Sequence, residues 1–242
     1  MPMEAGKQPV RKAIDKRALI REHPLLGALG PDFVDRLAAH ATMRTVKRGT
    51  TLFLKGDPGT SLFAVCAGSV KIGVPSASGR DAVFNVVGAG EVFGEIALLD
   101  GQPRTADAVT MTDCELMVID RRDFLPLVQE RPEFAVKLIE LLCGRLRRIS
   151  EQMEEVLFLN LPGRLAKALL RLSERKPRDQ GKLVITQREI GQMVGMSRES
   201  ANKQLRAWAK QRWVKLERGG IVVLAPQALT MVAAAAADEP DL

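Results

Sequence analysis

The sequence predicts an α+β chain in three parts, and three observations support that fold class. Between residues 46 and 119, short runs rich in Val, Ile, Leu and Phe alternate with turn residues, which is typical of antiparallel strands closing a jelly-roll-like β-roll. Residues 133–160 predict one long helix, because apolar residues recur every three or four positions. Residues 186–211 predict two capped helices in succession.

The composition excludes several classes of protein. With 242 residues, of which 46% are hydrophobic, the chain is long enough for two globular domains. No apolar run approaches the length of a bilayer span, so no membrane association is expected. Residues 1–17 lack the apolar stretch and cleavage site of a secretion signal. Cys66, Cys114 and Cys143 are odd in number and lie among apolar residues, which predicts buried thiols and a cytoplasmic location.

Neither a metal site nor an enzyme is expected. His23 and His40 are the only histidines, and neither has a neighbouring cysteine or carboxylate cluster. The sequence also contains no nucleophile–base pair or paired acid site beyond what a solvated surface offers.

The positive charge of the chain is concentrated in one region. Residues 160–220 contain 15 Lys and Arg against 5 Asp and Glu, a balance of +10, whereas the whole chain carries +7. Such a local excess is typical of a nucleic-acid-binding module, although a solvated surface can look similar.

The expected domain boundaries follow from these patterns. We expect a flexible basic tail at residues 1–24, the β-roll domain at 25–132, a long dimerisation helix at 133–160, a winged helix-turn-helix domain at 161–228 and a C-terminal tail at 229–242. Pro132 is expected to start the long helix. Pro162 and Gly163 are expected to interrupt it and form a hinge.

The long helix predicts a dimer. Its apolar residues alternate at spacings of three and four, which is the a/d pattern of a short coiled coil. The alternative is a helix that packs into the core of its own domain. Because the other faces of this helix carry charged residues, almost only the apolar stripe is suited to burial. We define the seam as these six residues: Ile139, Leu142, Leu146, Ile149, Met153 and Val156.

The stretch from residue 90 to 106 does not fit the strand pattern. Gly94 allows a close approach of the backbone, residues 95–99 suffice for one helical turn, and Arg104 and Thr105 follow a Gly/Pro bend. Helix N–H groups, a forked guanidinium and a hydroxyl together suit a phosphate. Because Glu95 would repel a phosphate, we expect its carboxylate to accept hydrogen bonds from sugar hydroxyls, which would specify a nucleotide. The alternative is a surface loop whose arginine forms a salt bridge.

Two helices and a hairpin are predicted near the C-terminus. The first helix, residues 187–194, begins with a capping box made by Thr186 and Glu189. The second helix spans residues 197–211, and residues 214–224 form a hairpin wing.

The second of these helices has a packing face and a polar face. Ala201, Leu205 and Trp208 form its packing stripe, so the polar face is free to read base edges in a major groove. Arg198 suits guanine and Glu199 suits cytosine. An exposed charged face is usually only solvated, and this remains the alternative. The candidate DNA contacts are Gln187, Arg188, Ser197, Arg198, Glu199, Asn202, Lys203, Arg206 and Lys210.

Two strings carry a resemblance to a known family. Residues 93–106, FGEIALLDGQPRTA, resemble the phosphate-binding cassette of cyclic-nucleotide-binding domains. Residues 185–200, ITQREIGQMVGMSRES, resemble the DNA-binding helix-turn-helix of the bacterial cyclic-AMP receptor/Fnr (Crp/Fnr) family, and the resemblance extends from about residue 25 to residue 226.

The resemblance implies a homodimeric transcription regulator whose effector is cyclic AMP or cyclic GMP. It implies binding to double-stranded DNA at a pseudo-palindromic site, and RNA polymerase as a further partner. The ligand-binding residues that it implies are Gly94, Glu95, Ile96, Ala97, Arg104, Thr105 and Ser150.

Three positions depart from the family pattern. Two adjacent hydroxyl residues on the long helix contact adenine in cyclic-AMP-responsive members, whereas this chain has Ile149 and Ser150. Thr105 resembles the cyclic-GMP-preferring versions of the cassette. The family's second recognition arginine is Lys203 here, which forks less rigidly onto guanine. Two further functions therefore stay open: a regulator that needs no effector or uses another one, and a nucleotide-sensing module that controls a partner protein.

Overall fold

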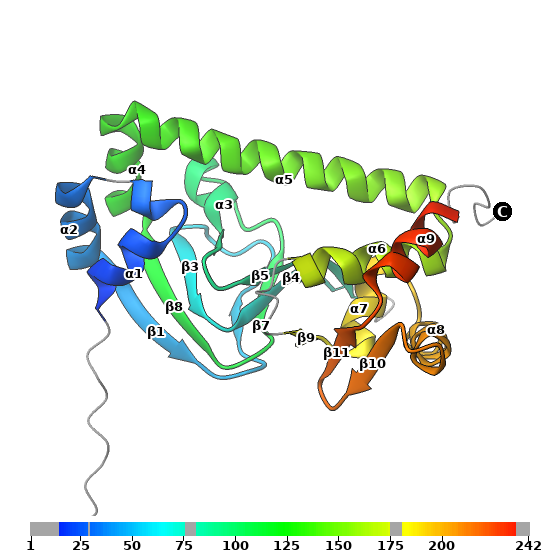
Figure 1. Cartoon of the computed structure of the whole chain (residues 1–242). Coiled ribbons are helices and arrows are strands. Elements are labelled where there is room, and N and C mark those ends of the chain that lie inside the picture. The colour runs from blue at the N-terminus through cyan, green and yellow to red at the C-terminus, as the bar shows by residue number, and fades with distance from the viewer. Residues whose placement is uncertain (1–14, 29, 76–80, 175–180, 236–242) are drawn as a thin grey trace, which may run out of the picture.

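Three parts follow one another along the chain in the computed structural model, which describes residues 15–28, 30–75, 81–174 and 181–235. A roll of antiparallel strands forms the N-terminal half, and helix α5 (Pro132–Phe158) runs past it as a long rod (Figure 1). A C-terminal domain, residues 161–235, lies beneath the far end of that rod. The predicted α+β class and the order of its parts are confirmed.

Two four-stranded antiparallel sheets form the β-roll. Their strand orders are β1-β8-β3-β6 and β2-β7-β4-β5. The bounds are β1 (Thr42–Val46), β2 (Thr51–Phe53), β3 (Ser61–Ala67), β4 (Ser69–Val74), β5 (Ala82–Gly88), β6 (Val92–Phe93), β7 (Asp107–Thr110) and β8 (Cys114–Asp120).

Strand β3 is buried on both of its faces, which explains its continuous apolar run. Phe63 and Val65 point into the core between the two sheets, where the rings of Phe63 and Phe93 stack with centroids 5.0 Å apart. Leu62 and Ala64 point the other way, under a layer of helices. Successive side chains alternate between faces, so burial of both faces requires apolar residues at every position.

Helices cover the outer face of the sheet that contains β3. They are α1 (Lys16–Glu22), the short turn η1 (Leu26–Ala28), α2 (Pro31–His40) and α4 (Arg121–Glu130). The prediction of a tail through residue 24 is wrong for residues 15–24, because Asp15 caps α1 and Ile20 is fully buried. A seven-residue helix is too short to give a periodic signal in the sequence. Residues 1–14 lie outside the described residues.

Helix α5 starts at Pro132 as predicted, and it has two apolar faces rather than one. Five seam residues are 55–65% exposed, and Leu142 is half-buried. On another face Phe134 and Leu138 are buried against α4 and the roll, and Glu155 is buried near the C-terminal end. The expectation that only the seam is fit for burial is therefore wrong. Cys143 is exposed on this helix, which also corrects the prediction that all three thiols are buried.

The bend between α5 and α6 (Leu161–Glu174) lies at Leu159 and Asn160 and not at Pro162-Gly163 as predicted. Pro162 is accommodated in the first turn of α6, where a backbone N–H would have no helical partner. Asn160 stabilises the same turn, because its Oδ1 accepts a hydrogen bond from the Gly163 N–H at 3.0 Å.

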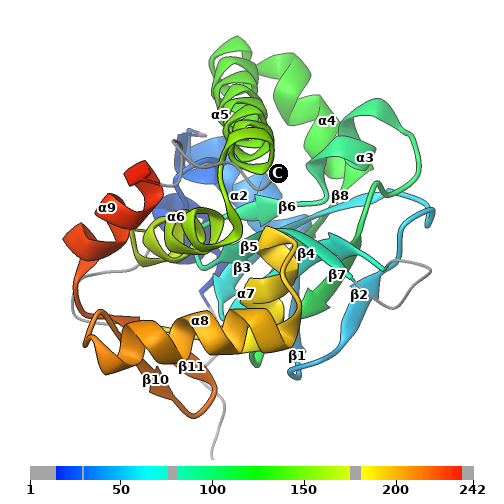
Figure 2. The same cartoon turned by 90° about the vertical axis from the view of Figure 1, so that its right-hand side faces the viewer.

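The C-terminal domain is a winged helix-turn-helix, as predicted. Its core contains Leu169, Ile190, Leu205 and Trp208, and α7 lies beside β5 of the roll (Figure 2). The elements after α6 are β9 (Lys182–Leu183), α7 (Gln187–Val194), α8 (Arg198–Lys210), β10 (Val214–Glu217), β11 (Gly220–Val223) and α9 (Pro226–Ala235).

Helix α9 corrects the predicted C-terminal tail. Leu229 is fully buried and Ala233 is 7% exposed, because both pack into the core of the C-terminal domain, where α9 lies against α6. The Ala-rich composition conceals this helix, since it gives little contrast between an apolar and a polar face. Residues 236–242 lie outside the described residues.

The burial of Ile20 yields a stability prediction. Ile20→Ala should lower the free energy of unfolding of the β-roll by about 2–5 kcal/mol, because it leaves a cavity under α1. Urea unfolding followed by circular dichroism measures this; tryptophan fluorescence is unsuitable, since both tryptophans, Trp208 and Trp213, lie in the C-terminal domain. The exposed neighbour Glu22→Ala is the control and should change stability by less than about 0.5 kcal/mol. Equal unfolding midpoints for the two variants would mean that α1 is not part of the core.

Candidate functional site

The loop that leads into helix α3 (Glu95–Asp100) depends on two glycines. Gly94 has φ +82°, a left-handed conformation, and a side chain there would place its Cβ 2.6 Å from Nη1 of Arg104. A Cβ on Gly59 would lie 2.1 Å from Cβ of Ala97, so the chain at residue 59 lies directly against α3. Both positions therefore need glycine for the backbone to approach closely.

Arg104 is buried without a carboxylate partner. Its side chain is 5% exposed; Nη1 donates to the Gly94 carbonyl at 2.8 Å, and Nη2 donates to the Ser61 carbonyl at 2.7 Å. Its guanidinium carbon lies 4.2 Å from the centroid of the Phe53 ring. Nε is buried and has no partner among the described residues.

Burial lowers the pKa of Arg104 below its ordinary value, while the negative charges of Glu95 and Asp57 act in the opposite direction. An arginine side chain is effectively always protonated in proteins, so the buried group is a cation. A buried cation that donates to neutral carbonyls has a strong electrostatic preference for an added anion.

Glu95 is paired with a residue that the sequence analysis did not place at the site. Its side chain is 1% exposed, and its Oε1 accepts from Nη1 of Arg145, which reaches across from α5 and also donates to the Val92 carbonyl. Arg145 lies outside the seam, on the part of α5 that the sequence analysis interpreted only as charged. Because the two residues are 50 positions apart, no local pattern could have found this pair.

The structure brings some predicted ligand residues together and leaves others at the surface. Gly94, Glu95, Ala97 and Arg104 surround the start of α3. Ile96 is 45% exposed, and Thr105 is exposed as well. Ser150 is exposed on α5, where its hydroxyl donates to the Leu146 carbonyl at 3.1 Å.

The predicted DNA contacts lie on the helix pair α7 and α8. The Thr186 side chain accepts from the Glu189 N–H, and the Glu189 carboxylate accepts from the Thr186 N–H at 2.8 Å, so the predicted capping box is present. Gly195 makes the left-handed turn between the helices at φ +74°. Ser197 caps α8 by accepting from the Ser200 N–H at 3.0 Å.

Helix α8 presents its polar face to the surface. Ala201, Leu205 and Trp208 are buried, as predicted. The candidates exposed at or near this face are Arg188, Ser197, Arg198, Glu199, Lys203, Arg206 and Lys210, whereas Gln187 and Asn202 are half-buried. Oδ1 of Asn202 is a buried acceptor without a partner among the described residues.

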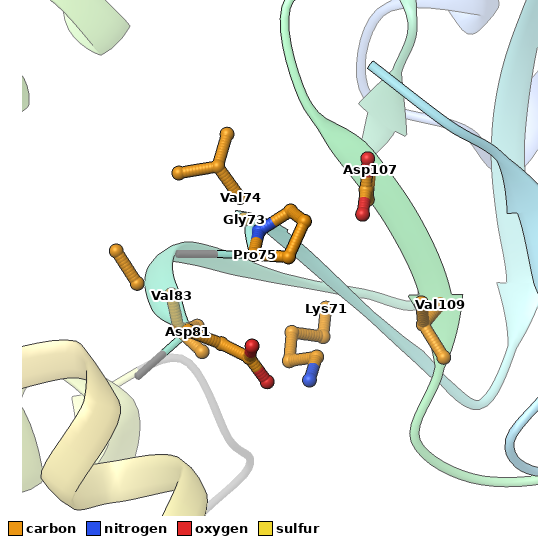
Figure 3. A pocket seen from close by; sticks show the side chains of 9 residues that line it. Lys71, Gly73, Val74, Pro75, Asp81, Val83, Asp107 and Val109 are labelled. Carbon is orange, nitrogen blue, oxygen red and sulfur yellow. The ribbon is translucent and has the colours of Figure 1, made fainter. Parts of the chain in front are cut away.

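A hollow of about 110 Å³ lies elsewhere, at the edge of the roll that faces the C-terminal domain. Lys71, Asp81 and Asp107 contribute charged side chains to its lining, as Figure 3 shows. None of the residues that surround the start of α3 lines this hollow. Among the described residues, no group of three or more His, Cys, Asp or Glu side chains could hold a metal ion. No helix in the described part of the chain is long and apolar enough to cross a bilayer.

Family models match both halves of the chain. The cyclic nucleotide-binding domain matches residues 43–131, and the Crp-like helix-turn-helix domain matches residues 163–232. These matches contain the Arg104 loop and the α7–α8 pair respectively.

Known regulators are similar over most of the length. The CRP-like cAMP-activated global transcriptional regulator of Mycobacterium tuberculosis is 36% identical over 181 residues, covering 73% of this chain and 81% of that protein. The cyclic AMP receptor protein of Thermus thermophilus is 33% identical over 201 residues, covering 83% and 92%. The mycobacterial relative is by its name a transcriptional regulator, and the two family models describe cyclic-nucleotide binding and a helix-turn-helix rather than a catalytic domain.

Solved structures share the fold. The c-di-GMP responsive global regulator CLP of Xanthomonas campestris is 27% identical with a TM-score of 0.67, covering 80% of this chain and 99% of that chain. A CRP/FNR family transcriptional regulator of Thermus thermophilus is 27% identical with a TM-score of 0.66, covering 81% and 100%.

The close approach at Gly94 predicts that a glycine-to-alanine substitution has opposite effects on stability at Gly94 and at Gly144. Gly94→Ala should destabilise the β-roll by more than about 1 kcal/mol, because the methyl group meets Arg104 and the left-handed backbone disfavours alanine. Gly144→Ala is the control: no heavy atom lies within 4 Å of its Cβ position on α5, so better helix propensity should stabilise the protein by about 0.5–1 kcal/mol. Thermal unfolding measures both. Opposite signs are expected, and equal shifts would contradict the geometry at Gly94.

Proposed function

Because this chain belongs to the Crp/Fnr family of transcription regulators, we propose that it is a cytoplasmic homodimer that binds specific DNA under the control of a cyclic nucleotide. The observation that carries the proposal is Arg104, a cation buried beside a glycine turn whose hydrogen-bond acceptors, two carbonyls and the Ser61 hydroxyl, are all neutral. A cyclic phosphate is the anion that this loop fits.

The proposed ligand contacts divide between phosphate and sugar. Arg104 holds the phosphate, with Nε as a buried donor still available to it, and the Thr105 hydroxyl adds a further donor. N–H groups at the start of α3, from Gly94 to Ala97, point toward the same anion. Arg145 takes Oε1 of Glu95, which orients the carboxylate so that its second oxygen accepts a sugar hydroxyl.

The residues that would contact the base of the nucleotide are Ile149 and Ser150 on the long helix, together with Thr105. Ile149 is 55% exposed on the seam, and Ser150 beside it is exposed too, so both can meet a base held by the partner subunit. Ile149 cannot donate to adenine, whereas Thr105 offers a hydroxyl to guanine. Cyclic GMP is therefore a candidate equal to cyclic AMP.

The seam supports the homodimer. Its exposed side chains form one apolar stripe along α5, which needs a matching surface, and a second copy of α5 supplies one in the heptad pattern. A twofold axis along the seam presents two α8 helices to duplex DNA at half-sites about one helical turn apart, roughly 34 Å. RNA polymerase is the expected further partner at a promoter.

Two other functions remain as alternatives. Ile149 favours a family member that is independent of an effector or uses another one, and the Xanthomonas relative is by its name responsive to c-di-GMP. A nucleotide-sensing module that controls a partner protein is the other alternative; the exposed polar face of α8 and the local +10 charge argue against it.

Calorimetry with cyclic AMP, cyclic GMP and cyclic di-GMP side by side tests the ligand. We expect one cyclic mononucleotide to bind and Arg104→Met to weaken that binding about 100-fold or more, because two or more charge-assisted hydrogen bonds are lost. Arg122→Met, which removes an exposed charge from α4, is the control and should bind as the wild type does. Unchanged binding by a folded Arg104→Met variant would remove this assignment.

Fluorescence anisotropy with labelled duplexes tests the DNA contacts. Arg198→Ala should relax one base position by about 1–3 kcal/mol, while Lys210→Ala should weaken all sequences alike and reduce the salt slope by about 1.

Leu146→Asp is the control for dimerisation in the same assay. A carboxylate in the seam should give monomers by sedimentation and lose the affinity for palindromic duplexes. A wild-type protein that stays monomeric at micromolar concentration, without salt-sensitive affinity for any palindrome, would refute the proposed function.

A further inference from the structure

An ion cluster joins the long helix to the C-terminal domain just before the bend. Glu155 on the last turns of α5 is 6% exposed, and its Oε1 accepts from Nη1 of Arg171 on α6. Nζ of Lys167, one turn earlier on α6, lies 3.9 Å from the same oxygen. A buried carboxylate is retained only with such partners, so the cluster fixes how α6 is rotated against α5.

A second contact holds the C-terminal domain from another side. Nε2 of Gln192 on α7 donates to Oδ2 of Asp81, at the start of β5, at 3.2 Å. Met111, in the turn after β7, is 4% exposed and packs in the core cluster of the C-terminal domain, and Val86 of β5 packs against that cluster. The domain therefore contacts both the long helix and the roll (Figure 2).

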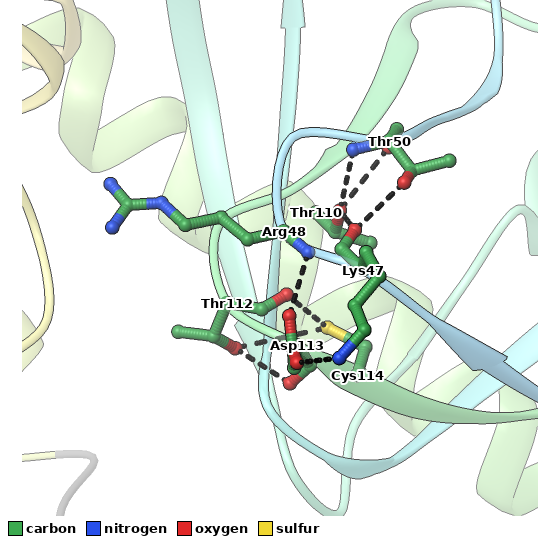
Figure 4. A network of polar contacts seen from close by, with 7 residues as sticks. All are labelled: Lys47, Arg48, Thr50, Thr110, Thr112, Asp113 and Cys114. Carbon is green, nitrogen blue, oxygen red and sulfur yellow. Dashed lines mark hydrogen bonds and ion pairs between the residues drawn. The ribbon is translucent and has the colours of Figure 1, made fainter.

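Strand β7 connects this second contact to the Arg104 loop. Two residues separate Arg104 from the start of β7, and Met111 directly follows the strand. Figure 4 shows how the far end of β7 is anchored: the Thr110 hydroxyl accepts from the Thr50 N–H at 2.9 Å and donates to the Lys47 carbonyl at 2.7 Å. Strand β7 is thus a continuous, hydrogen-bonded connection between the Arg104 loop and Met111.

The long helix connects the other contact to the same loop. Arg145 binds Glu95 in the pocket, and Glu155 lies ten residues further along the same continuous helix. Between them Nε2 of Gln152 donates to the Phe84 carbonyl of β5 at 3.5 Å. Each of the two contacts on the C-terminal domain is thus joined to the pocket by one rigid element.

We propose that Glu155 is the pivot through which the nucleotide pocket sets the position of the DNA-binding domain, with the Asp81–Gln192 contact as its counterpart on the roll. This inference rests on the proposed function. Glu155 touches neither ligand nor DNA; it is a positioning residue. Without the charge of Glu155, α6 is no longer fixed on α5. Nucleotide binding then no longer determines the distance between the two α8 helices.

The test is the ratio of DNA affinities with and without the cyclic nucleotide that binds the wild type, measured by anisotropy on a palindromic duplex. Glu155→Gln should reduce that ratio at least about tenfold, as expected when a coupling element is lost. Calorimetry in the absence of DNA should give a nucleotide affinity within about twofold of the wild type, because the pocket is untouched. Glu154→Gln is the matched control: it makes the same change of charge at an exposed position next to Glu155 and should keep the full ratio.

Asp81→Ala is a second test of the proposal, for the case that the Glu155→Gln variant does not fold. It removes the carboxylate acceptor at the edge of the roll and should also lower the ratio, with circular dichroism as a check on folding. If the wild type shows no nucleotide-dependent DNA affinity, the proposed function fails. If the wild type responds and a folded Glu155→Gln keeps its ratio, the pivot is refuted while the proposed function stands. If Glu155→Gln does not fold, an Asp81→Ala variant that keeps the ratio refutes it in the same way.

Discussion

The charge of Arg104 is the constraint on which the pocket depends. A guanidinium removed from water needs acceptors, and the Gly94 and Ser61 carbonyls supply them without neutralising the charge. Gly94 must lack a side chain because Nη1 occupies that space, and the ring of Phe53 covers the planar group. The turn before α3, the end of β3 and the ring of Phe53 on β2 are therefore arranged around a single cation, which leaves an anion as the natural complement.

Helix α5 links the parts of the molecule because its faces differ in chemistry. One stripe is apolar and exposed, and it is available to a second copy. The face toward the roll is apolar near its start, where Phe134 and Leu138 pack, and then becomes ionic at Arg145. Near the end of the helix, Glu155 pairs with α6 instead. Apolar packing holds the helix in place without fixing its contacts in detail, whereas each ion pair ties it to one named side chain.

Features determined by neighbouring residues could be predicted from the sequence. The capping box at Thr186, the close backbone approach at Gly94 and the apolar seam are local patterns with local physical causes. The fold class likewise follows from the alternation of strands and turns, the long helix and the two capped helices. The Glu95–Arg145 pair could not be found, because it joins residues 50 positions apart. The burial of Ile20 and Leu229 was missed because it depends on partners that short or Ala-rich helices do not reveal. Pro162 misled for a different reason: proline marks a helix start as readily as a helix break.

The joint between α5 and α6 explains why an ion cluster suits a pivot better than an apolar contact would. Apolar surfaces attract without direction, so a bend held only by them would tolerate many rotations of the C-terminal domain. A carboxylate facing a guanidinium has narrow angular limits, and burial makes its loss costly. At the bend the Leu159 carbonyl accepts from Nε of Arg164 at 3.0 Å and Asn160 Oδ1 accepts from the Gly163 N–H at 3.0 Å. Glu155, one turn before the bend, adds an ionic contact with α6. In the dimer that we propose, the geometry of this carboxylate contributes to the distance between the two α8 helices.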